Sequence, residues 1–346
     1  MPTPSAILDL HFFRDTPKFA VASSTGTISI YQVCLENIGA EKFEANSDNA
    51  RQSEDSGATV KEVKGPPLKG RIQNIATHQI FPSDVIITAF SWWPKNRDNE
   101  SAYLAATTNN GSVYLARLNK ELTECSLLNG EMPVNRHTLE AWTCVFDPKF
   151  GNRLYSGGDD GKLRIVTRDL TNSSDMEYQK YQNPSAHSGH NAGVTAILPL
   201  NIGENHTELL TGSYDDYARV FELGTHHAPM KRSRLAAELY IGGGVWRLKL
   251  FSQYPLNDDH GTIKYRVLAS CMHAGARILE LEGNKDGEWS IKILASVEVH
   301  ESMNYGSDVQ PVDKEPYDCW DDERVCVSTS FYDKLLFVWK FDPKAV

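Results

Sequence analysis

Short runs of alternating apolar and polar residues recur along the whole chain, and each run is interrupted by a tight polar turn. The clearest is LLTGSYDDYARVFE at Leu209–Glu222, where an apolar run leads into the turn Tyr214–Asp216 and a second apolar run follows. Alternation with a period of two residues is typical of half-buried β-strands, and Gly, Ser and Asp are typical of the turns between them. This stretch therefore predicts two antiparallel strands joined by a short turn.

The same pattern recurs with an acidic residue at the same place in the turn. Tyr155–Val166 and Ser328–Trp339 align with it and put Asp160 and Asp333 where the first run has Asp215. Fainter copies put other residues at that place: Thr25 in Ala22–Tyr31, Asn110 in Ala105–Leu115 and Ala274 in Ala269–Leu279. The six turn positions 25, 110, 160, 215, 274 and 333 are separated by 85, 50, 55, 59 and 59 residues. Repetition at this spacing indicates a repeat protein with long insertions.

A second feature accompanies the best copy. Gly189-His190 precedes it, and an apolar residue, Val194, follows the histidine at the fourth position. A Gly-His start, an apolar inner strand and an Asp in the turn together resemble one WD repeat. The chain is therefore predicted to be an all-β protein, a WD-repeat β-propeller with six recognisable repeats. In this fold Asp160, Asp215, Asp333 and His190 are expected to be structural, because they satisfy backbone and imidazole hydrogen bonds of the turns.

A propeller is one closed unit, so residues 1–346 are predicted to form a single domain. Two segments depart from the strand pattern. Residues 36–70 are polar and are expected to be a disordered insertion in the first blade, which accounts for the spacing of 85 residues. Residues 310–323 are expected to be an acidic loop inserted in the sixth blade.

The amino-acid composition argues against several classes of function. The net charge of −10 argues against direct nucleic-acid binding, and no apolar run is long enough for membrane insertion. The six cysteines form no Cys-x-x-Cys pair and indicate reduced thiols in a cytoplasmic protein rather than a disulfide framework. We expect a monomer without a cofactor or a metal site. The chain contains no Gly-x-Ser-x-Gly elbow, no dinucleotide-binding glycine motif and no P-loop.

Candidate chemistry gathers on one predicted face of the propeller, where the loops before the inner strands and the turns between the second and third strands meet. Trp142, Trp246 and Tyr305 all lie five residues after the Gly-His position of their blades. These aromatic residues could simply wedge the blades together. Alternatively they could be the walls of a pocket in which Arg247 contacts an anion or a carbonyl group and His273 is a general base or a hydrogen-bond donor. Asp159 and Asp216, which adjoin the structural turn residues, are expected to face solvent and contact a substrate.

Several short sequence motifs in these repeats closely resemble those of one family. They are YSGGDDG at 155–161, TGSYDD at 211–216, GGGVWRLK at 242–249, CMHAG at 271–275, NYGSD at 304–308 and SFYD at 330–333. The chain is similar, from about Ala6 to its last residue, to the WD-repeat diphthine methylesterases of the diphthamide pathway, which are also called diphthine methyltransferases. GGGVWR followed by CMHAG and SFYD is the most specific part of this resemblance.

The resemblance implies a reaction and a partner. The substrate would be elongation factor 2 carrying methylated diphthine, and the enzyme would hydrolyse the methyl ester to a carboxylate and methanol. His273 would be the base, Arg247 or Tyr305 the oxyanion donor, and Trp142 and Trp246 the walls of the site. The family usually has one more repeat before the segment that begins here at Ala6, so the resemblance also implies a seven-bladed fold without its first blade. The alternative is a non-catalytic WD-repeat scaffold, for instance an adaptor in trafficking or in ubiquitin ligation.

Overall fold

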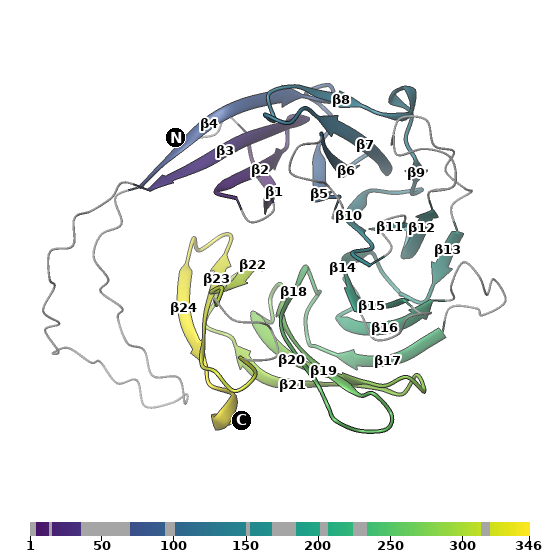
Figure 1. The fold of residues 1–346 in the computed structure, drawn as a ribbon, viewed down its shortest axis with the longest axis vertical. Helices are drawn as coiled ribbons and strands as arrows, with labels where there is room; N and C mark the ends of the chain where they lie inside the picture. Colours follow the sequence, from purple (N-terminus) through teal and green to yellow (C-terminus); the bar gives the residue numbers. More distant parts are fainter. Residues whose placement is uncertain are drawn as a thin grey trace, which may run out of the picture.

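The structure is a computed structural model, and it describes residues 5–13, 16–35, 70–93, 101–149, 153–167, 185–200, 207–223, 234–312 and 319–346. These residues form six antiparallel sheets, called blades 1 to 6 in chain order, which are arranged around a common centre (Figure 1). The predicted all-β propeller with six repeats is thereby confirmed. None of the helices in the described ranges is long and apolar enough to cross a membrane.

The first three blades are each built outward from an inner strand. Blade 1 contains β1 (Ile7–Phe12), β2 (Lys18–Ser23), β3 (Thr27–Leu35) and β4 (Gly70–Gln79). Blade 2 contains β5 (Ile87–Trp92), β6 (Ala102–Thr108), β7 (Ser112–Leu118), β8 (Cys125–Leu127) and β9 (Asn135–Arg136), with the 3-10 turn η1 (Asn129–Glu131) between the last two. Blade 3 contains β10 (Ala141–Phe146), β11 (Arg153–Gly158), β12 (Lys162–Thr167) and β13 (Ser185–Ser188).

The remaining blades follow the same plan. Blade 4 contains β14 (Val194–Leu200), β15 (Thr207–Ser213), β16 (Tyr217–Leu223) and β17 (Arg234–Tyr240). Blade 5 contains β18 (Arg247–Pro255), β19 (Ile263–Ser270), β20 (Ala276–Gly283) and β21 (Trp289–Val297). Blade 6 contains β22 (Asn304–Val309), β23 (Arg324–Ser330) and β24 (Leu336–Phe341), before a last 3-10 turn, η3 (Pro343–Ala345).

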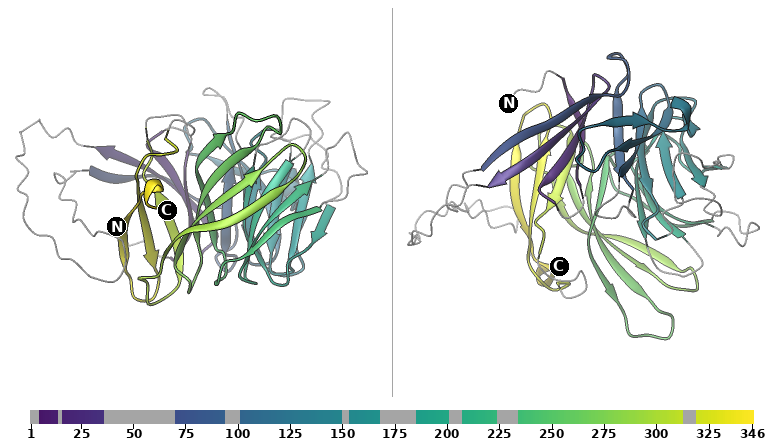
Figure 2. Two further views of the ribbon diagram at one scale, coloured as in Figure 1. Left: turned by 90° about the horizontal axis from the view of Figure 1, so that it is seen from below. Right: turned by 45° about the horizontal axis from the view of Figure 1, so that its top comes forward.

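The hydrophobic core lies between neighbouring blades rather than at one place. Leu210 and Val220 of blade 4, for example, pack with Tyr265, Val267 and Leu281 of blade 5. Middle strands such as β11 and β15 are buried along their whole length, because a blade covers each of their two faces. The outer strands β4 and β21 contain only exposed and half-buried residues. Seen from the side, the strands of each blade run between the two faces of the disc (Figure 2).

Blade 6 differs from the other five because its described part has three strands instead of at least four. The outer edge of β24 is therefore unpaired among the described residues, and its Leu336 and Val338 are exposed. In Figure 1, blades 6 and 1 border the open side of the ring. The apolar residues Leu10 and Phe12 of β1 are also exposed. The seventh blade implied by the resemblance stays a prediction.

The two predicted insertions can be followed only in part. Residues 36–69 lie outside the described part of the chain, and Gly70 begins β4. Within the acidic loop of blade 6, residues 313–318 likewise lie outside it. At the end of this loop the Trp320 carbonyl accepts a hydrogen bond from Arg266, and the Arg266 guanidinium stacks on the Trp320 ring at 3.7 Å. The end of the loop is thus anchored on blade 5.

Candidate functional site

The inner strands share an irregularity at the point where they enter their blades. In five of the six, the pairing register shifts around the second residue, which identifies a β-bulge at Leu8, Thr88, Trp142, Thr195 and Tyr305. A bulge re-aims the side chain of the extra residue, and bulges are frequent beside functional sites. Two of the three aromatic residues singled out from the sequence therefore occupy equivalent bulges, one in blade 3 and one in blade 6.

The bulged threonines hold the backbone next to the two tryptophans. The Thr88 hydroxyl of blade 2 donates to the Ala141 carbonyl, immediately before Trp142. The Thr195 hydroxyl of blade 4 donates to the Val245 carbonyl, immediately before Trp246. Both threonines are buried, so these bonds are shielded from water. Each tryptophan is thus positioned by the blade that precedes its own.

Four aromatic side chains from four blades meet on this face, and we call them the aromatic cluster: Trp142, Tyr214, Trp246 and Tyr305. The Trp246 ring lies at their middle, with ring centroids 5.6 Å from Trp142, 5.8 Å from Tyr214 and 5.2 Å from Tyr305. Tilted contacts at these distances are favourable for aromatic pairs. The structure therefore brings together the three aromatic residues that the sequence had aligned.

Tyr214 was missed by the sequence reasoning, which treated it only as part of a turn. The signal was nevertheless present, because the turns between second and third strands were expected on this same face. Burial raises the pKa of Tyr214, the charge of Asp159 and the nearby Tyr305 raise it further, and Arg247 opposes them. The Tyr214 hydroxyl consequently stays protonated near neutral pH and can donate a hydrogen bond.

Asp159 contacts the cluster directly. Its Oδ1 accepts a hydrogen bond of 2.7 Å from Nε1 of Trp142. The cluster continues at the other end through Phe331, whose ring centroid is 5.9 Å from that of Tyr305, to Tyr332 at 5.1 Å from Phe331. Both of these last residues are exposed. The face thus carries an aromatic strip with a carboxylate at one end and two exposed rings at the other.

Arg247 connects the aromatic cluster to the first blade. Its guanidinium lies 5.4 Å from the centre of the Trp246 ring, and its Nη2 lies 3.4 Å from both Asp9 Oδ1 and the Leu8 carbonyl oxygen. Its side chain is 27% exposed, so it keeps contact with solvent. Arg247 was predicted as an anion contact, and its partner in this structure is a carboxylate of blade 1.

That carboxylate, Asp9, is buried and accepts from three blades. Besides Arg247, the Phe90 N–H of blade 2 donates to its Oδ2 at 3.0 Å, and Nε2 of His11 lies 3.1 Å from the same oxygen. Burial alone would raise the pKa of Asp9. His11, Arg247 and the hydrogen bonds outweigh that effect and lower it to about 2. Asp9 is therefore ionised at neutral pH, and neither Asp9 nor His11 was found from the sequence.

His273, the predicted base, lies in the turn between β19 and β20. Its neighbour Met272 pairs with the backbone of Asn304 at the start of β22, which places this turn beside Tyr305. The His273 side chain is exposed and makes no hydrogen bond or ion pair with the described residues. Asp216 is half-buried, with a left-handed backbone at φ 67°. Nothing in the structure orients either side chain toward the aromatic cluster.

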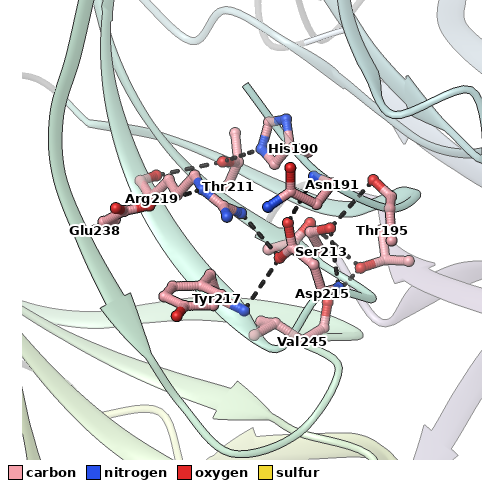
Figure 3. A network of polar contacts seen from close by, with 12 residues as sticks. His190, Asn191, Thr195, Thr211, Ser213, Asp215, Tyr217, Arg219, Glu238 and Val245 are labelled. Atoms are coloured by element: carbon pink, nitrogen blue, oxygen red, sulfur yellow. Dashed lines mark hydrogen bonds and ion pairs between the residues drawn. The ribbon is translucent and has the colours of Figure 1, made fainter. Parts of the chain in front are cut away.

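The predicted turn residues of blade 4 form a network (Figure 3). Asp215 accepts from the Asn191 N–H at 2.8 Å, from the Tyr217 N–H at 3.2 Å and from Nη1 of Arg219 at 2.8 Å. Nε2 of His190 lies 2.8 Å from the Thr211 hydroxyl, and burial lowers the pKa of this histidine to about 4. These contacts tie the β13–β14 segment to the turn between β15 and β16.

Equivalent carboxylates hold the turns of two other blades. In blade 3, Nδ1 of His137 lies 2.8 Å from Asp160, which also accepts from the Thr138 N–H at 3.2 Å. In blade 6, Asp333 accepts from the hydroxyl groups of Ser302, at 2.7 Å, and Ser330. Because these carboxylates are engaged within their own blades, the aromatic strip and the group around Asp9 are the better candidates for chemistry.

Neither a metal nor a disulfide contributes to this face in the described part of the chain. No group of three or more His, Cys, Asp and Glu residues there has an arrangement that could hold a metal ion. All six cysteines are free thiols. The described side chains on this face include aromatic rings, the carboxylates of Asp159 and Asp9, and the guanidinium of Arg247.

Comparison with known proteins gives two kinds of similarity. No family model matches the chain. The chain is 25% identical to the diphthine methyltransferase of Saccharomyces cerevisiae over 97% of its own length and 84% of that protein. It is 27% identical to the diphthine methyltransferase homolog of Dictyostelium discoideum, over 79% of this chain and 67% of that one. It is 29% identical to the Homo sapiens diphthine methyltransferase over 50% of its length, which is 32% of the human protein.

Among solved structures, a chain of the crystal structure of the mitotic checkpoint complex superposes with a TM-score of 0.54. The alignment covers 99% of this chain and 76% of that one, at 12% sequence identity. At this identity the superposition establishes the fold alone.

Proposed function

Because the chain belongs to the diphthine methyltransferase family and thereby has a role in the diphthamide pathway, we propose that it hydrolyses the methyl ester of methylated diphthine on elongation factor 2. The products would be diphthine and methanol, and the substrate would be a folded protein. The proposed place of action is the cytoplasm, and the proposed active form is a monomer.

One observation carries this proposal. The sequence motifs that resemble the family are the ones that build the face described above. GGGVWRLK contributes Trp246 and Arg247, NYGSD contributes Tyr305, and TGSYDD contributes Tyr214. These residues come from three blades, and they are in contact through the Trp246 ring. A similarity that only reflected propeller packing would not need to concentrate on one face.

Ester hydrolysis needs a donor for the oxyanion and a wall that holds the substrate. Arg247 and Tyr305 are the proposed donors. Trp142 and Trp246 are the proposed walls, with Asp159 and Asp216 as further substrate contacts. His273 is the base that the sequence suggests. Full activity of a folded His273→Ala variant would remove it from that role.

The direct test is to incubate the purified protein with elongation factor 2 carrying methylated diphthine and to follow the modified peptide by mass spectrometry. The expected result is loss of the mass of one CH₂ group together with release of methanol. A Trp246→Ala variant should lose this activity, because the cluster is assembled around that ring. Its matched control is Trp289→Ala, which changes a tryptophan that packs on Tyr265 in blade 5, outside the cluster.

The second candidate is a non-catalytic WD-repeat scaffold. The exposed rings of Phe331 and Tyr332 favour it, because exposed aromatic residues on a rigid face are typical of protein docking sites. A scaffold should lose its partner when Phe331 and Tyr332 are changed to alanine and should tolerate Arg247→Ala. An esterase should lose turnover with Arg247→Ala even if substrate binding survives.

A further inference from the structure

We propose that His11, oriented by Asp9, is the general base of the site, an inference that rests on the ester hydrolysis proposed above. The His11 side chain is 48% exposed and belongs to β1, the innermost strand of its blade (Figure 1). Its Nε2 lies 3.1 Å from Asp9 Oδ2, and its ring packs edge-on against Phe90 at 5.0 Å. The imidazole is thus held by a carboxylate and an aromatic ring while part of it stays open to solvent.

The hydrogen bond to Asp9 determines which nitrogen can act. Asp9 is ionised and can only accept, so Nε2 of a neutral His11 must carry the proton and donate it. Nδ1 then has a free lone pair, and it makes no hydrogen bond with any residue of the described ranges. An imidazole that donates from one nitrogen to a fixed carboxylate and offers the other to a water molecule is the arrangement that general-base catalysis needs.

Asp9 is well suited to hold a base. It keeps its charge in a buried position because Phe90 N–H, the Leu10 N–H and Arg247 all point at it. Its negative charge stabilises the imidazolium that forms when His11 takes a proton. Among the described residues, the charged and titratable groups around the pair are Asp9 itself, Arg247 of blade 5 and the buried Cys144 of blade 3, whose pKa responds to both Asp9 and Arg247.

The same carboxylate places an oxyanion donor next to the base. Arg247 contacts Oδ1 of Asp9, and His11 contacts Oδ2 of the same carboxylate. The guanidinium and the imidazole therefore flank one fixed group. The Arg247 guanidinium also lies 5.4 Å from the centre of the Trp246 ring, which is the middle of the aromatic cluster. His11 lies three residues along β1 from the bulge at Leu8, which is about 10 Å at 3.3 Å per residue. A long, flexible side chain that enters at the aromatic cluster could therefore present its ester near His11.

The chemical step balances without a cofactor. His11 Nδ1 accepts a proton from water as the water oxygen bonds to the ester carbonyl carbon, and the resulting oxyanion is stabilised by Arg247. The intermediate then expels the methoxy group, which takes the proton from His11 and leaves as methanol. The new carboxylic acid releases its remaining proton to solvent as a carboxylate. One ester and one water thus become one carboxylate, one methanol and one proton.

The test compares turnover by wild-type protein and by His11→Ala and His11→Gln variants on elongation factor 2 carrying methylated diphthine. We expect kcat to fall about 100-fold or more with KM nearly unchanged, in line with the 10²–10⁴-fold contribution of general acid–base catalysis. Added imidazole should partly restore turnover to His11→Ala, since the base is then supplied from solution. The Gln variant retains a side-chain amide that can donate to Asp9, so it guards against loss of fold.

The matched control is His260→Ala. His260 also pairs with a carboxylate, Asp286, at 2.8 Å, but it lies in the exposed loop between β18 and β19. Its removal should leave kcat unchanged. Asp9→Asn, which changes the positioning residue, should lower kcat and also alter the pH dependence of kcat, an effect that a purely structural role would not produce.

The outcomes separate the two proposals. Absence of ester hydrolysis by the wild-type protein overturns the proposed function and, with it, the role of His11. Hydrolysis by the wild type and by a folded His11→Gln variant at more than about a third of the wild-type rate overturns only the role of His11. Loss of turnover in His273→Ala but not in His11→Ala would assign the base to His273 instead.

Discussion

Asp215 and Asp216 are adjacent carboxylates to which the structure gives different tasks, and this difference can be measured. Asp215 is almost buried, at 8% exposure, and pairs with Arg219, which is 3% exposed. Asp216 is half-buried and makes no side-chain hydrogen bond or ion pair within the described residues. We therefore predict that Asp215→Asn destabilises the fold and that Asp216→Asn does not.

The magnitude follows from the three donors on Asp215. An asparagine has one acceptor oxygen, so its NH₂ group must face either the Asn191 N–H or the pair formed by Tyr217 N–H and Arg219. The variant thus loses at least one hydrogen bond and leaves the Arg219 charge with only the half-exposed Glu238. Loss of one charge-assisted bond and part of a buried pair costs about 3 kcal/mol. With an m value of about 3 kcal/mol/M, the urea midpoint should fall by roughly 1 M.

The loss of stability caused by Asp215→Asn should also depend on pH. Burial raises the pKa of Asp215, but the bonds from Arg219 and from the Asn191 N–H outweigh it, so the pKa lies below its ordinary value of 3.8. A carboxyl group whose pKa is lower in the folded state than in the unfolded state stabilises the fold. This contribution is complete at a pH above the pKa of the unfolded state, and it is lost as the pH falls toward the pKa of the folded state. The stability difference between wild type and Asp215→Asn should consequently be largest near pH 7 and should shrink below about pH 4.

The assay is urea unfolding followed by tryptophan fluorescence at pH 7 and at pH 3.5, with Asp216→Asn as the control. Asparagine tolerates the left-handed backbone of position 216, so the control should unfold within about 0.5 kcal/mol of wild type. Equal midpoints for wild type and Asp215→Asn at pH 7, or a difference that is independent of pH, would refute the reasoning.

Three further predictions test other parts of the structure. Thr195→Val removes the donor to the buried Val245 carbonyl, so it should lower the free energy of unfolding by about 1–3 kcal/mol and shift the fluorescence of Trp246. An unchanged fluorescence spectrum would mean that this hydrogen bond does not position the Trp246 ring. Val338→Lys adds a charge to the outer edge of β24, which pairs with no described strand, and should lower self-association in analytical ultracentrifugation at high concentration. Equal self-association of the variant and the wild type would mean that this edge does not mediate association. Burial raises the pKa of the Cys271 thiol to about 12, so this cysteine should resist alkylation at pH 8 until the protein is unfolded, as followed by peptide mass spectrometry.

Much of the fold was predictable because propeller blades are local structures. Each blade pairs strands that follow one another in the chain, so the period-two pattern and the turn residues are sufficient to predict it. Asp160, Asp215 and Asp333 aligned for the same reason, since their donors lie within a single blade or at its entry. The aromatic residues Trp142 and Tyr305 could be aligned because each enters its strand at the same bulge.

Tertiary structure decided which of these local features meet. Asp9 and Arg247 are separated by 238 residues, and only the curvature of the ring brings blade 5 opposite blade 1. His11 looks like any polar residue of an alternating strand until Asp9 is seen beside it, and Tyr214 looks like a turn residue until Trp246 is placed against it. The sequence by itself therefore determined the strands, the turns and their repetition, because these depend on neighbours within one blade. The site depended on the angle between blades, which results from the packing of whole sheets and has no short-range pattern.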